Sequence, residues 1–235
     1  MSGRRLIVNA DDLGLSGGVN RGIARAHEHG IVTSASLMVR RPAAEGAAAY
    51  ARAHPSLGIG LHVDLGEWRY TGGTWIAAYE VVPAGDADAV AAEVAAQLER
   101  FTGLIGRTPT HLDSHQHLHR DEPVRSVVLQ HGRRLGVPVR GDRPGIRYAG
   151  GFHGQSGRGE PWPEGITPEH LCGLLRALPP GTTELGCHPG LDDDSGSSYC
   201  AERTVETATL CDVRVLETVH AERIELLSFS GSGRA

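Results

Sequence analysis

The stretch LIVNADDLG at residues 6–14 joins a short apolar run to two adjacent carboxylates and a glycine. Its first five residues, Leu6–Ala10, predict a buried strand, because short apolar runs of this kind fill the interior of parallel sheets. Asp11 and Asp12 follow where the strand stops and a glycine-rich turn begins. Residues 18–29 then have the composition of a helix, so the chain opens with a βα unit.

The same alternation of short apolar runs and longer Ala-, Leu- and Arg-rich segments continues along the chain. Six further strands are predicted at Thr33–Val39, Leu57–His62, Thr110–Asp113, Val137–Arg140, Thr183–Cys187 and Ile224–Phe229. The clearest further helices are predicted at Ala43–Ala53, Ala87–Leu104, Pro123–Arg134, Pro168–Leu178 and Ala201–His220, the last broken near Cys211. Seven strands joined by helical crossovers imply a parallel sheet.

Polar residues gather at the carboxyl ends of these predicted strands. His62 ends the third strand, Asp113 ends the fourth with His115 just after it, and His188 follows the sixth. A barrel brings such ends together around one axis, whereas an open sheet disperses them. The pattern therefore favours an α/β fold of the (β/α)-barrel type, distorted or incomplete, with seven parallel strands instead of eight.

Three stretches rich in glycine, proline or serine are predicted to be loops, at residues 66–73, 142–166 and 191–198. None of them has the length of a linker between domains. The 235 residues are 40% hydrophobic, which is enough for a sizeable core. We therefore expect one domain over residues 1–235.

The composition excludes several classes of protein. All 23 basic residues are arginine, and a chain without lysine cannot be a Schiff-base, pyridoxal-phosphate or P-loop enzyme. The formal net charge of −5 offers nucleic acid no attractive field. Thirteen histidines, in contrast, supply ample imidazole for metal binding or proton transfer.

Two patterns bear on where the protein works and with what partner. The apolar run Leu6-Ile7-Val8 is too short for a signal-peptide core, and no stretch approaches the roughly 20 apolar residues of a membrane span. We therefore expect a cytoplasmic protein with no membrane partner. The Ala-rich helices on the outside of a barrel could pack in a homodimer.

The adjacent carboxylates Asp11 and Asp12 suggest two different chemical roles at one site. One carboxylate would ligate a cation, and its neighbour would take a proton from a bound water. The alternative is structural, with Asp12 capping a turn and Asp11 solvated.

The stretch HLDSHQHLH at residues 111–119 carries a polar ring or carboxylate at every second position. On an extended backbone these side chains share one face. A surface strand would also explain them, just as core packing would explain His62 taken alone. Two imidazoles and one carboxylate, however, make a three-ligand set that leaves positions open for water and substrate, as a catalytic metal requires.

Weaker signals lie near the other strand ends and in the loop after His62. His188 stands where a general acid could protonate a leaving group, although it could also pack beneath a loop. Arg140 could orient carboxylates or hydroxyls, or form an ordinary salt bridge. Trp68, Tyr70 and Trp75 could form a stacking platform for a sugar ring or a small satellite core.

An ordered set of motifs carries a family resemblance. These are NADDLG at 9–14, GLH at 60–62, HLDSHQH at 111–117 and CHP at 187–189, with supporting segments at 32–34, 140–143 and 199–203. In order and spacing they resemble the YdjC-like carbohydrate deacetylases along nearly the whole chain. The resemblance implies a distorted (β/α) barrel that binds one divalent cation and removes acetyl groups from N-acetylated sugars such as chitin disaccharides.

The resemblance also implies roles for individual residues. Asp12, His62 and His115 would be the metal ligands and Asp11 the catalytic base, and His188 matches a family histidine near the site. We further hypothesise that His188 is the general acid. Family members are usually assigned Mg²⁺, whereas two imidazoles among three protein ligands suit Zn²⁺ or another transition metal better. The expected cofactor is therefore one divalent metal ion, with its identity left open.

Substrate binding is expected to involve Asp113 and Arg140, with Asp113 also placed to orient an imidazole. The chain departs from the family after His62, where Val63-Asp64 stands in place of the usual Asn and Thr, and the stretch 66–86 is short. The alternatives are a metal-dependent hydrolase of another amide or of a phosphoester, and a sugar-binding barrel without catalysis.

Overall fold

The computed structural model describes residues 3–192 and 196–231. Six strands form a continuous curled sheet in which every pairing is parallel. Their order is β6 (Leu112–Ser114), β3 (Gly58–Val63), β2 (Ser34–Leu37), β1 (Arg4–Leu13), β8 (Gly181–Cys187) and β7 (Ile146–Ala149). The two-residue strand β9 (Glu225–Leu226) pairs with β1 off this path, in register with Arg5 and Leu6.

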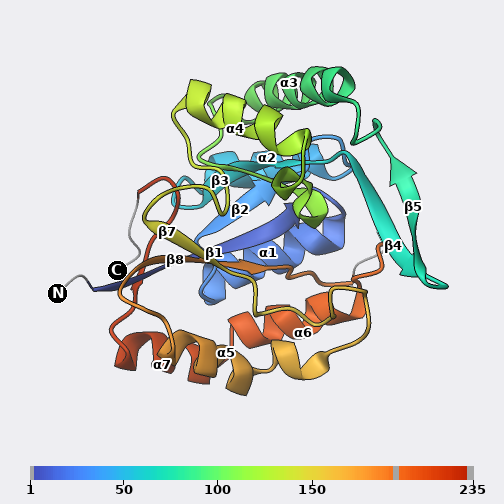
Figure 1. The fold of residues 1–235 in the computed structure, drawn as a ribbon. Helices are drawn as coiled ribbons and strands as arrows, with labels where there is room; N and C mark the ends of the chain where they lie inside the picture. Colours follow the sequence, from blue (N-terminus) through green and yellow to red (C-terminus); the bar gives the residue numbers. More distant parts are fainter. Residues whose placement is uncertain (1–2, 193–195, 232–235) are drawn as a thin grey trace.

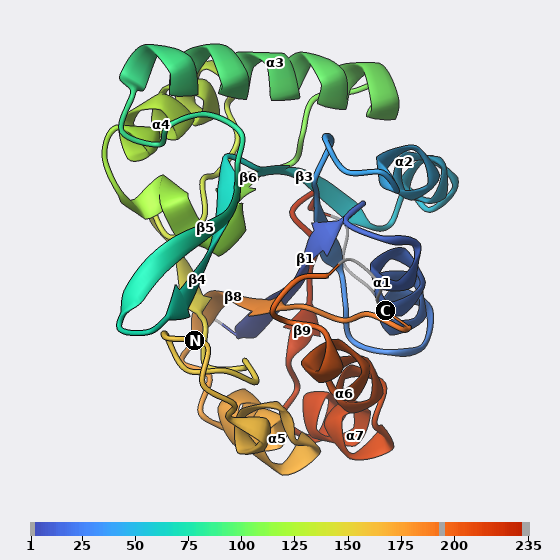
Figure 2. The same ribbon diagram turned by 90° about the vertical axis from the view of Figure 1, so that its right-hand side faces the viewer.

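The helices surround the outside of the sheet, as Figures 1 and 2 show. They are α1 (Gly17–His29), α2 (Ala44–Ala53), α3 (Ala87–Ile105), α4 (Val124–Leu135), α5 (Pro168–Arg176), α6 (Ala201–Leu210) and α7 (Val213–Ala221). All of β1 from Leu6 to Leu13 is buried, which is the condition of a central strand covered on both faces. The predicted α/β fold of a distorted or incomplete (β/α) barrel is confirmed, and so is the break of the last long helix near Cys211.

One predicted strand is wrong. Residues 137–140 contribute only a single parallel bridge, between Val139 and Leu112, because Pro138 has no N–H to donate and Gly141 turns away at φ 75°. The sheet gains β7 instead, inside the stretch 142–166 that was predicted to be a loop. The continuous sheet therefore has six strands, and the predicted count of seven is reached only with β9.

A second predicted loop, 66–73, is also wrong. Strands β4 (Gly66–Thr71) and β5 (Thr74–Glu80) form an antiparallel hairpin that closes at Gly72 and Gly73, both with positive φ. Two such glycines between short strands are a common hairpin turn. In Figure 1 this hairpin stands at the right of the molecule, beyond the ends of the parallel strands.

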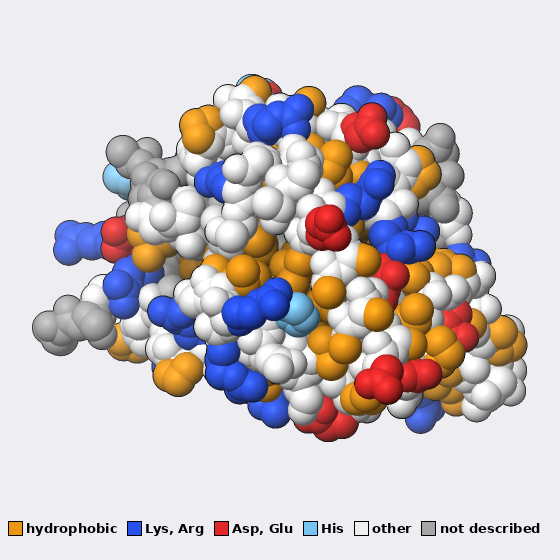
Figure 3. Space-filling view, turned by 90° about the horizontal axis from the view of Figure 1, so that it is seen from above, with side chains coloured by type: hydrophobic (Ala, Val, Ile, Leu, Met, Phe, Trp, Pro, Cys, Tyr) orange, Lys and Arg blue, Asp and Glu red, His pale blue; other side chains and the backbone are white. Residues whose placement is uncertain are grey.

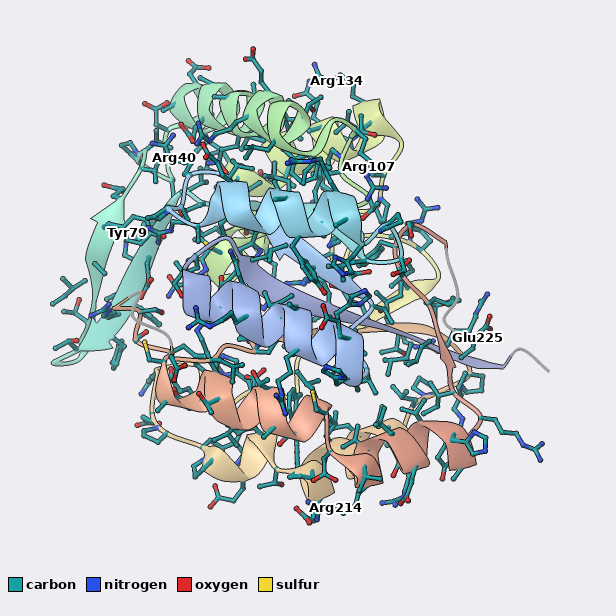
Figure 4. The ribbon with its side chains drawn as sticks, turned by 180° about the vertical axis from the view of Figure 1, so that it is seen from behind. Arg40, Tyr79, Arg107, Arg134, Arg214 and Glu225 are labelled. Carbon is teal, nitrogen blue, oxygen red and sulfur yellow. The ribbon has the colours of Figure 1, made fainter. Side chains whose placement is uncertain are left out.

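The hairpin is attached to the barrel near its base by Tyr79. The Tyr79 hydroxyl donates to Asp64 Oδ1 at 2.7 Å, and the Arg41 guanidinium lies 4.2 Å from the centre of the Tyr79 ring. Figure 4 shows Tyr79 on the hairpin, beside the body of the molecule. The hairpin is therefore placed over the carboxyl ends of the strands, where the polar residues lie.

Two observations concern the rest of the surface and the chain. The face seen in Figure 3 carries arginine and acidic side chains intermingled with hydrophobic ones, in keeping with the modest net charge. Among the described residues, no helix combines the length and the hydrophobicity needed to cross a membrane.

The predicted loop 191–198 contains residues 193–195, which lie outside the described part, and its other residues belong to neither helix nor strand.

Candidate metal centre and active site

The polar residues predicted at strand ends meet at one edge of the sheet. Asp11 and Asp12 come near the end of β1, His62 from β3, and His115 begins the 3₁₀ helix η1 (His115–Arg120) that follows β6. All four are at least nine-tenths buried. His188 follows β8 on the other side of β1. The predicted convergence of these strands is confirmed.

A local distortion of β1 brings both of its carboxylates into the site. Asp12 has φ 66°, a left-handed conformation that aspartate tolerates better than most residues. The pairing of β1 with β2 shifts register between Ala10 and Leu13 at the same place. The strand alternation is interrupted there, so neighbouring side chains reach the same site instead of opposite faces of the sheet.

Asp12, His62 and His115 form a compact group of potential metal ligands. His115 Nδ1 lies 3.0 Å and His62 Nε2 lies 3.3 Å from the same oxygen, Asp12 Oδ1. One donor atom from each residue lies within 4.8 Å of the others. Asp11, His62 and Asp113 form a second such group, which shares His62 with the first.

The charges around these imidazoles favour a cation. Burial lowers the pKa of His62, but Asp113 and Asp12 outweigh it and raise the pKa to about 10. Burial also lowers the pKa of His115, but Asp12 and Glu67 outweigh it and raise the pKa to about 9. Without a metal, both rings therefore hold a proton at neutral pH. A bound cation would take the place of these protons, because only neutral imidazole ligates.

The protonation of His62 and His115 predicts that metal affinity depends on pH. Because the pKa values of His62 and His115 are raised, both protons are held below about pH 9 and must leave when metal binds. The affinity for Zn²⁺ is expected to rise as the pH is raised from 6 to 9, with release of up to two protons per ion. Calorimetry in buffers of different ionisation enthalpy measures this number directly. Proton release close to zero over this range would contradict the assignment.

Two of the three candidate ligands, His62 and Asp12, each contact an oppositely charged residue through the atom that points away from the metal group. Asp113 Oδ1 lies 2.8 Å from His62 Nδ1, which directs His62 Nε2 toward Asp12. Arg203 Nη2 donates to Asp12 Oδ2 at 2.7 Å, which leaves Oδ1 for the centre. Partners of this kind fix the tautomer and orientation of metal ligands.

Asp11 is held as a buried carboxylate beside this group. Burial raises its pKa, but the Arg140 guanidinium outweighs burial and lowers it. Arg140 donates to both oxygens of Asp11, at 2.6 and 2.7 Å, and Asn9 Nδ2 donates to Oδ1 at 2.8 Å. Asp11 is therefore ionised at neutral pH and fixed in orientation.

His188 lies next to Asp11 with a partly exposed ring. Its side chain is 20% exposed, and its Nε2 lies 3.9 Å from Asp11 Oδ2. Burial lowers the pKa of His188 to about 3, so the ring is neutral at neutral pH. Its other nitrogen, Nδ1, faces Glu206 at 3.9 Å. A neutral imidazole next to a carboxylate can accept a proton and pass it on.

The expected contact of Asp113 and Arg140 with substrate does not fit their burial. The Arg140 side chain is fully buried, and it pairs with Asp113 at 2.8 Å and with Glu184 at 2.7 Å besides Asp11. Asp113 is fully buried as well, and its second oxygen accepts from the Ser36 hydroxyl at 2.7 Å. The carboxyl groups of Asp11, Asp113 and Glu184 are buried, and they need a positive charge close by. The Arg140 guanidinium supplies that charge, and its N–H groups are used in doing so. Asp113 and Arg140 are both buried and hold the carboxylates of the site together.

The expectation that residues 111–119 share one face is also wrong. The strand ends at Ser114, and Gln116 and His117 adopt left-handed conformations in η1, so the two-residue alternation stops. His111 lies away from the metal group, with its Nε2 3.0 Å from the Ser36 hydroxyl. Of the four histidines in the motif, His115 is the member that joins the candidate metal group.

Two residues of the site were not assigned a role from the sequence. Arg203 belongs to a segment that resembles the family, but nothing in its spacing links it to Asp12, 191 residues earlier. Glu67 lies in the stretch that was predicted to be a loop, and it approaches His115 Nε2 at 3.7 Å. The double glycine of the hairpin turn is the signal that could have placed Glu67 on a strand.

Curated relatives match nearly the whole chain. A carbohydrate deacetylase of Geobacillus stearothermophilus is 36% identical over 96% of this chain and 97% of its own length. A chitooligosaccharide deacetylase of Serratia marcescens is 34% identical over 94% of this chain and 96% of its own.

Solved structures share the fold. A crystal structure from Enterococcus faecalis V583 superimposes with a TM-score of 0.80 at 24% identity, covering 99% of this chain and all of that one. A family 4 carbohydrate esterase from Streptomyces lividans, in complex with acetate, gives a TM-score of 0.58 at 12% identity, covering all of this chain and 98% of that one. Residues 5–221 match the family described as YdjC-like protein. The chain therefore belongs to the YdjC-like family.

Proposed function

We propose that this chain is a metal-dependent carbohydrate deacetylase that hydrolyses the acetamide of N-acetylated sugars. The observation that carries the proposal is the Asp-His-His group at the carboxyl edge of the sheet, next to a carboxylate held by arginine. The curated relatives, which are named carbohydrate and chitooligosaccharide deacetylases, support the reaction class.

The residues present fit a divalent cation. Asp12, His62 and His115 offer one oxygen and two nitrogens, and three protein ligands leave positions open for water and substrate. When bound, the cation would lower the pKa of a water molecule and polarise the acetyl carbonyl. Two imidazoles in the set favour Zn²⁺ or another transition metal, whereas the family resemblance suggests Mg²⁺.

The proposed proton transfers use Asp11 and His188. Asp11 removes a proton from the attacking water, whose oxygen forms a bond to the acetyl carbon. The C–N bond then breaks, and the departing sugar amine receives a proton from His188. His188 Nε2 lies 3.9 Å from Asp11 Oδ2, which is longer than a hydrogen bond. One bridging water or a small movement of the His188 ring would therefore carry the proton taken from water to the amine. Water and amide are thus converted to acetic acid and amine with no net change in protons on the protein, and the acid then loses its proton to solvent.

The substrate class is proposed to be short chitooligosaccharides such as N,N′-diacetylchitobiose. The hairpin that carries Glu67 also carries aromatic side chains near its turn, with Trp75 52% exposed and its ring centre 5.4 Å from that of Tyr70. Half-exposed rings fit the sugar-stacking interpretation better than the satellite core. Arg158, 5.3 Å from the Tyr70 ring centre, could add a polar contact.

The location, the domain organisation and the partners of the chain are also part of the proposal. A cytoplasmic location stays a prediction. The single domain over residues 1–235 and the absence of a nucleic-acid partner stay predictions. The homodimer also stays a prediction, and the alanines of α2 do not support it because they pack inward, namely Ala44, Ala47, Ala48 and Ala51.

Acetate release tests the proposed function. The purified chain would be treated with chelator and assayed on N,N′-diacetylchitobiose and on single N-acetyl sugars, before and after addition of Zn²⁺, Co²⁺, Mn²⁺ or Mg²⁺. We expect no release after chelation and recovery with at least one metal. Hydrolysis of compounds from a phosphoester panel, without acetate release, would favour the alternative of a metal-dependent phosphoester hydrolase. Sugar binding without hydrolysis of any substrate, in the metal-loaded chain, would favour the non-catalytic barrel.

A further inference from the structure

Glu67 is a buried carboxylate that the hairpin carries into the metal centre. The residue is 4% exposed and lies on β4. Its Oε2 lies 3.7 Å from His115 Nε2, slightly more than the length of a hydrogen bond. That nitrogen is buried and has no hydrogen-bond partner within the described part of the chain. Glu67 therefore faces the ring nitrogen of His115 that is turned away from Asp12.

The arrangement repeats the one around His62. Each imidazole directs one nitrogen at Asp12 Oδ1, His62 through Nε2 at 3.3 Å and His115 through Nδ1 at 3.0 Å. The far nitrogen of His62 meets the Asp113 carboxylate at 2.8 Å, and the far nitrogen of His115 meets Glu67. A carboxylate on the far nitrogen of a ligand imidazole sets its tautomer and its orientation.

The hairpin is held in register with His115 by the next residue in the chain. Gln116 exchanges two hydrogen bonds of 2.8 Å with the backbone N–H and carbonyl of Trp68, which follows Glu67. On the opposite side, the other oxygen of Glu67 lies 3.4 Å from the backbone N–H of Ser198 and 3.5 Å from Arg69 Nε. These contacts fix Glu67 relative to His115 from three directions.

We propose that Glu67 is the positioning carboxylate of His115. It accepts a hydrogen bond from Nε2–H and thereby holds Nδ1, without its proton, toward the position of the cation. The inference rests on the metal site proposed above and extends it to the hairpin. Docking of β4 and affinity for the cation are then linked, because the same side chain takes part in both.

Zn²⁺ binding to the full chain, measured by competition with a chelator, tests this role. Glu67→Leu is expected to weaken Zn²⁺ binding about 10- to 100-fold. Glu67→Gln is expected to give an intermediate loss, because the amide oxygen can accept the same hydrogen bond without the charge. Glu80→Leu, at an exposed position of the same hairpin, is the matched control and should bind as the parent does. The Co²⁺ absorption bands should shift in Glu67→Leu and stay in place in Glu80→Leu.

The outcomes separate this role from a structural one and from the function itself. If Glu67 served only to hold the hairpin, Glu67→Leu would lower the melting temperature and leave Zn²⁺ affinity and Co²⁺ bands unchanged, which would overturn the proposal. A parent chain that binds no Zn²⁺ would overturn both the metal site and the role of Glu67. Tight Zn²⁺ binding that depends on Glu67, without acetate release, would support the positioning role and count against the deacetylase.

Discussion

Replacing Asp11 by Asn is expected to lower kcat for acetate release by about 100- to 10,000-fold, the usual contribution of a positioned base. The substituted amide keeps the shape of the side chain and cannot take a proton from water. Metal binding should persist, because the Asp12, His62 and His115 group does not include Asp11. The two measurements are single-turnover acetate release and Zn²⁺ affinity on the same preparation.

The control for this variant is Asp121→Asn, at an exposed position outside the site. It should match the parent in both measurements. Full activity of the Asp11→Asn chain with metal bound would exclude Asp11 as the base, and His188 would become the candidate for that step. Loss of metal together with activity would instead place Asp11 among the ligands.

Removing a ligand imidazole is expected to abolish metal binding and activity together. His115→Ala takes away one of three donors, so the loss of Zn²⁺ affinity should exceed the roughly 10- to 100-fold cost of losing an outer partner. Acetate release should fall in parallel and should recover only at much higher metal concentrations. Equilibrium dialysis followed by metal analysis gives the affinity, and the same samples give the activity.

The comparison needs variants that still fold. His29→Ala, at an exposed position on α1, is the matched histidine control and should change neither metal affinity nor activity. Asp12→Asn is preferred to Asp12→Ala, since the amide oxygen can still accept the hydrogen bond that the buried Arg203 donates to Asp12 Oδ2, although the charge is lost. A His115→Ala chain that kept parental Zn²⁺ affinity would refute the ligand assignment.

The convergence of the candidate ligands could be predicted because strand geometry carries that information locally, whereas their roles were implied by the family resemblance and stay a prediction. Asp12, His62 and His115 each stand within two residues of the end of a short apolar run, and parallel strands bring such ends together. The same rule placed Asp11 and His188 at the site. Prediction succeeded where a few neighbouring residues determine both the element and the position of the side chain.

Prediction failed where contacts between distant segments decide the outcome. Val137–Arg140 has the composition of a strand, yet Pro138 and Gly141 restrict it to one bridge with Leu112 of β6, and the additional strand β7 pairs with β8 at the other end of the sheet. The partners of the ligands, Arg203 and Glu67, come from elements far from them in the chain. Their roles depend on tertiary packing, which no local pattern encodes.

Arg140 also determines how many cations this edge of the sheet can hold. Asp11, His62 and Asp113 form a second potential ligand group that shares His62 with the first. The guanidinium lies against both of its carboxylates, so a fixed positive charge already offsets part of their negative charge. A second divalent ion would have to displace or repel that charge at close range in a buried site. Arg140 thus acts as a permanent counter-ion built into the protein. The arrangement favours the proposed centre with a single cation, in which Asp11, the carboxylate beside the ligand Asp12, stays free to take up a proton.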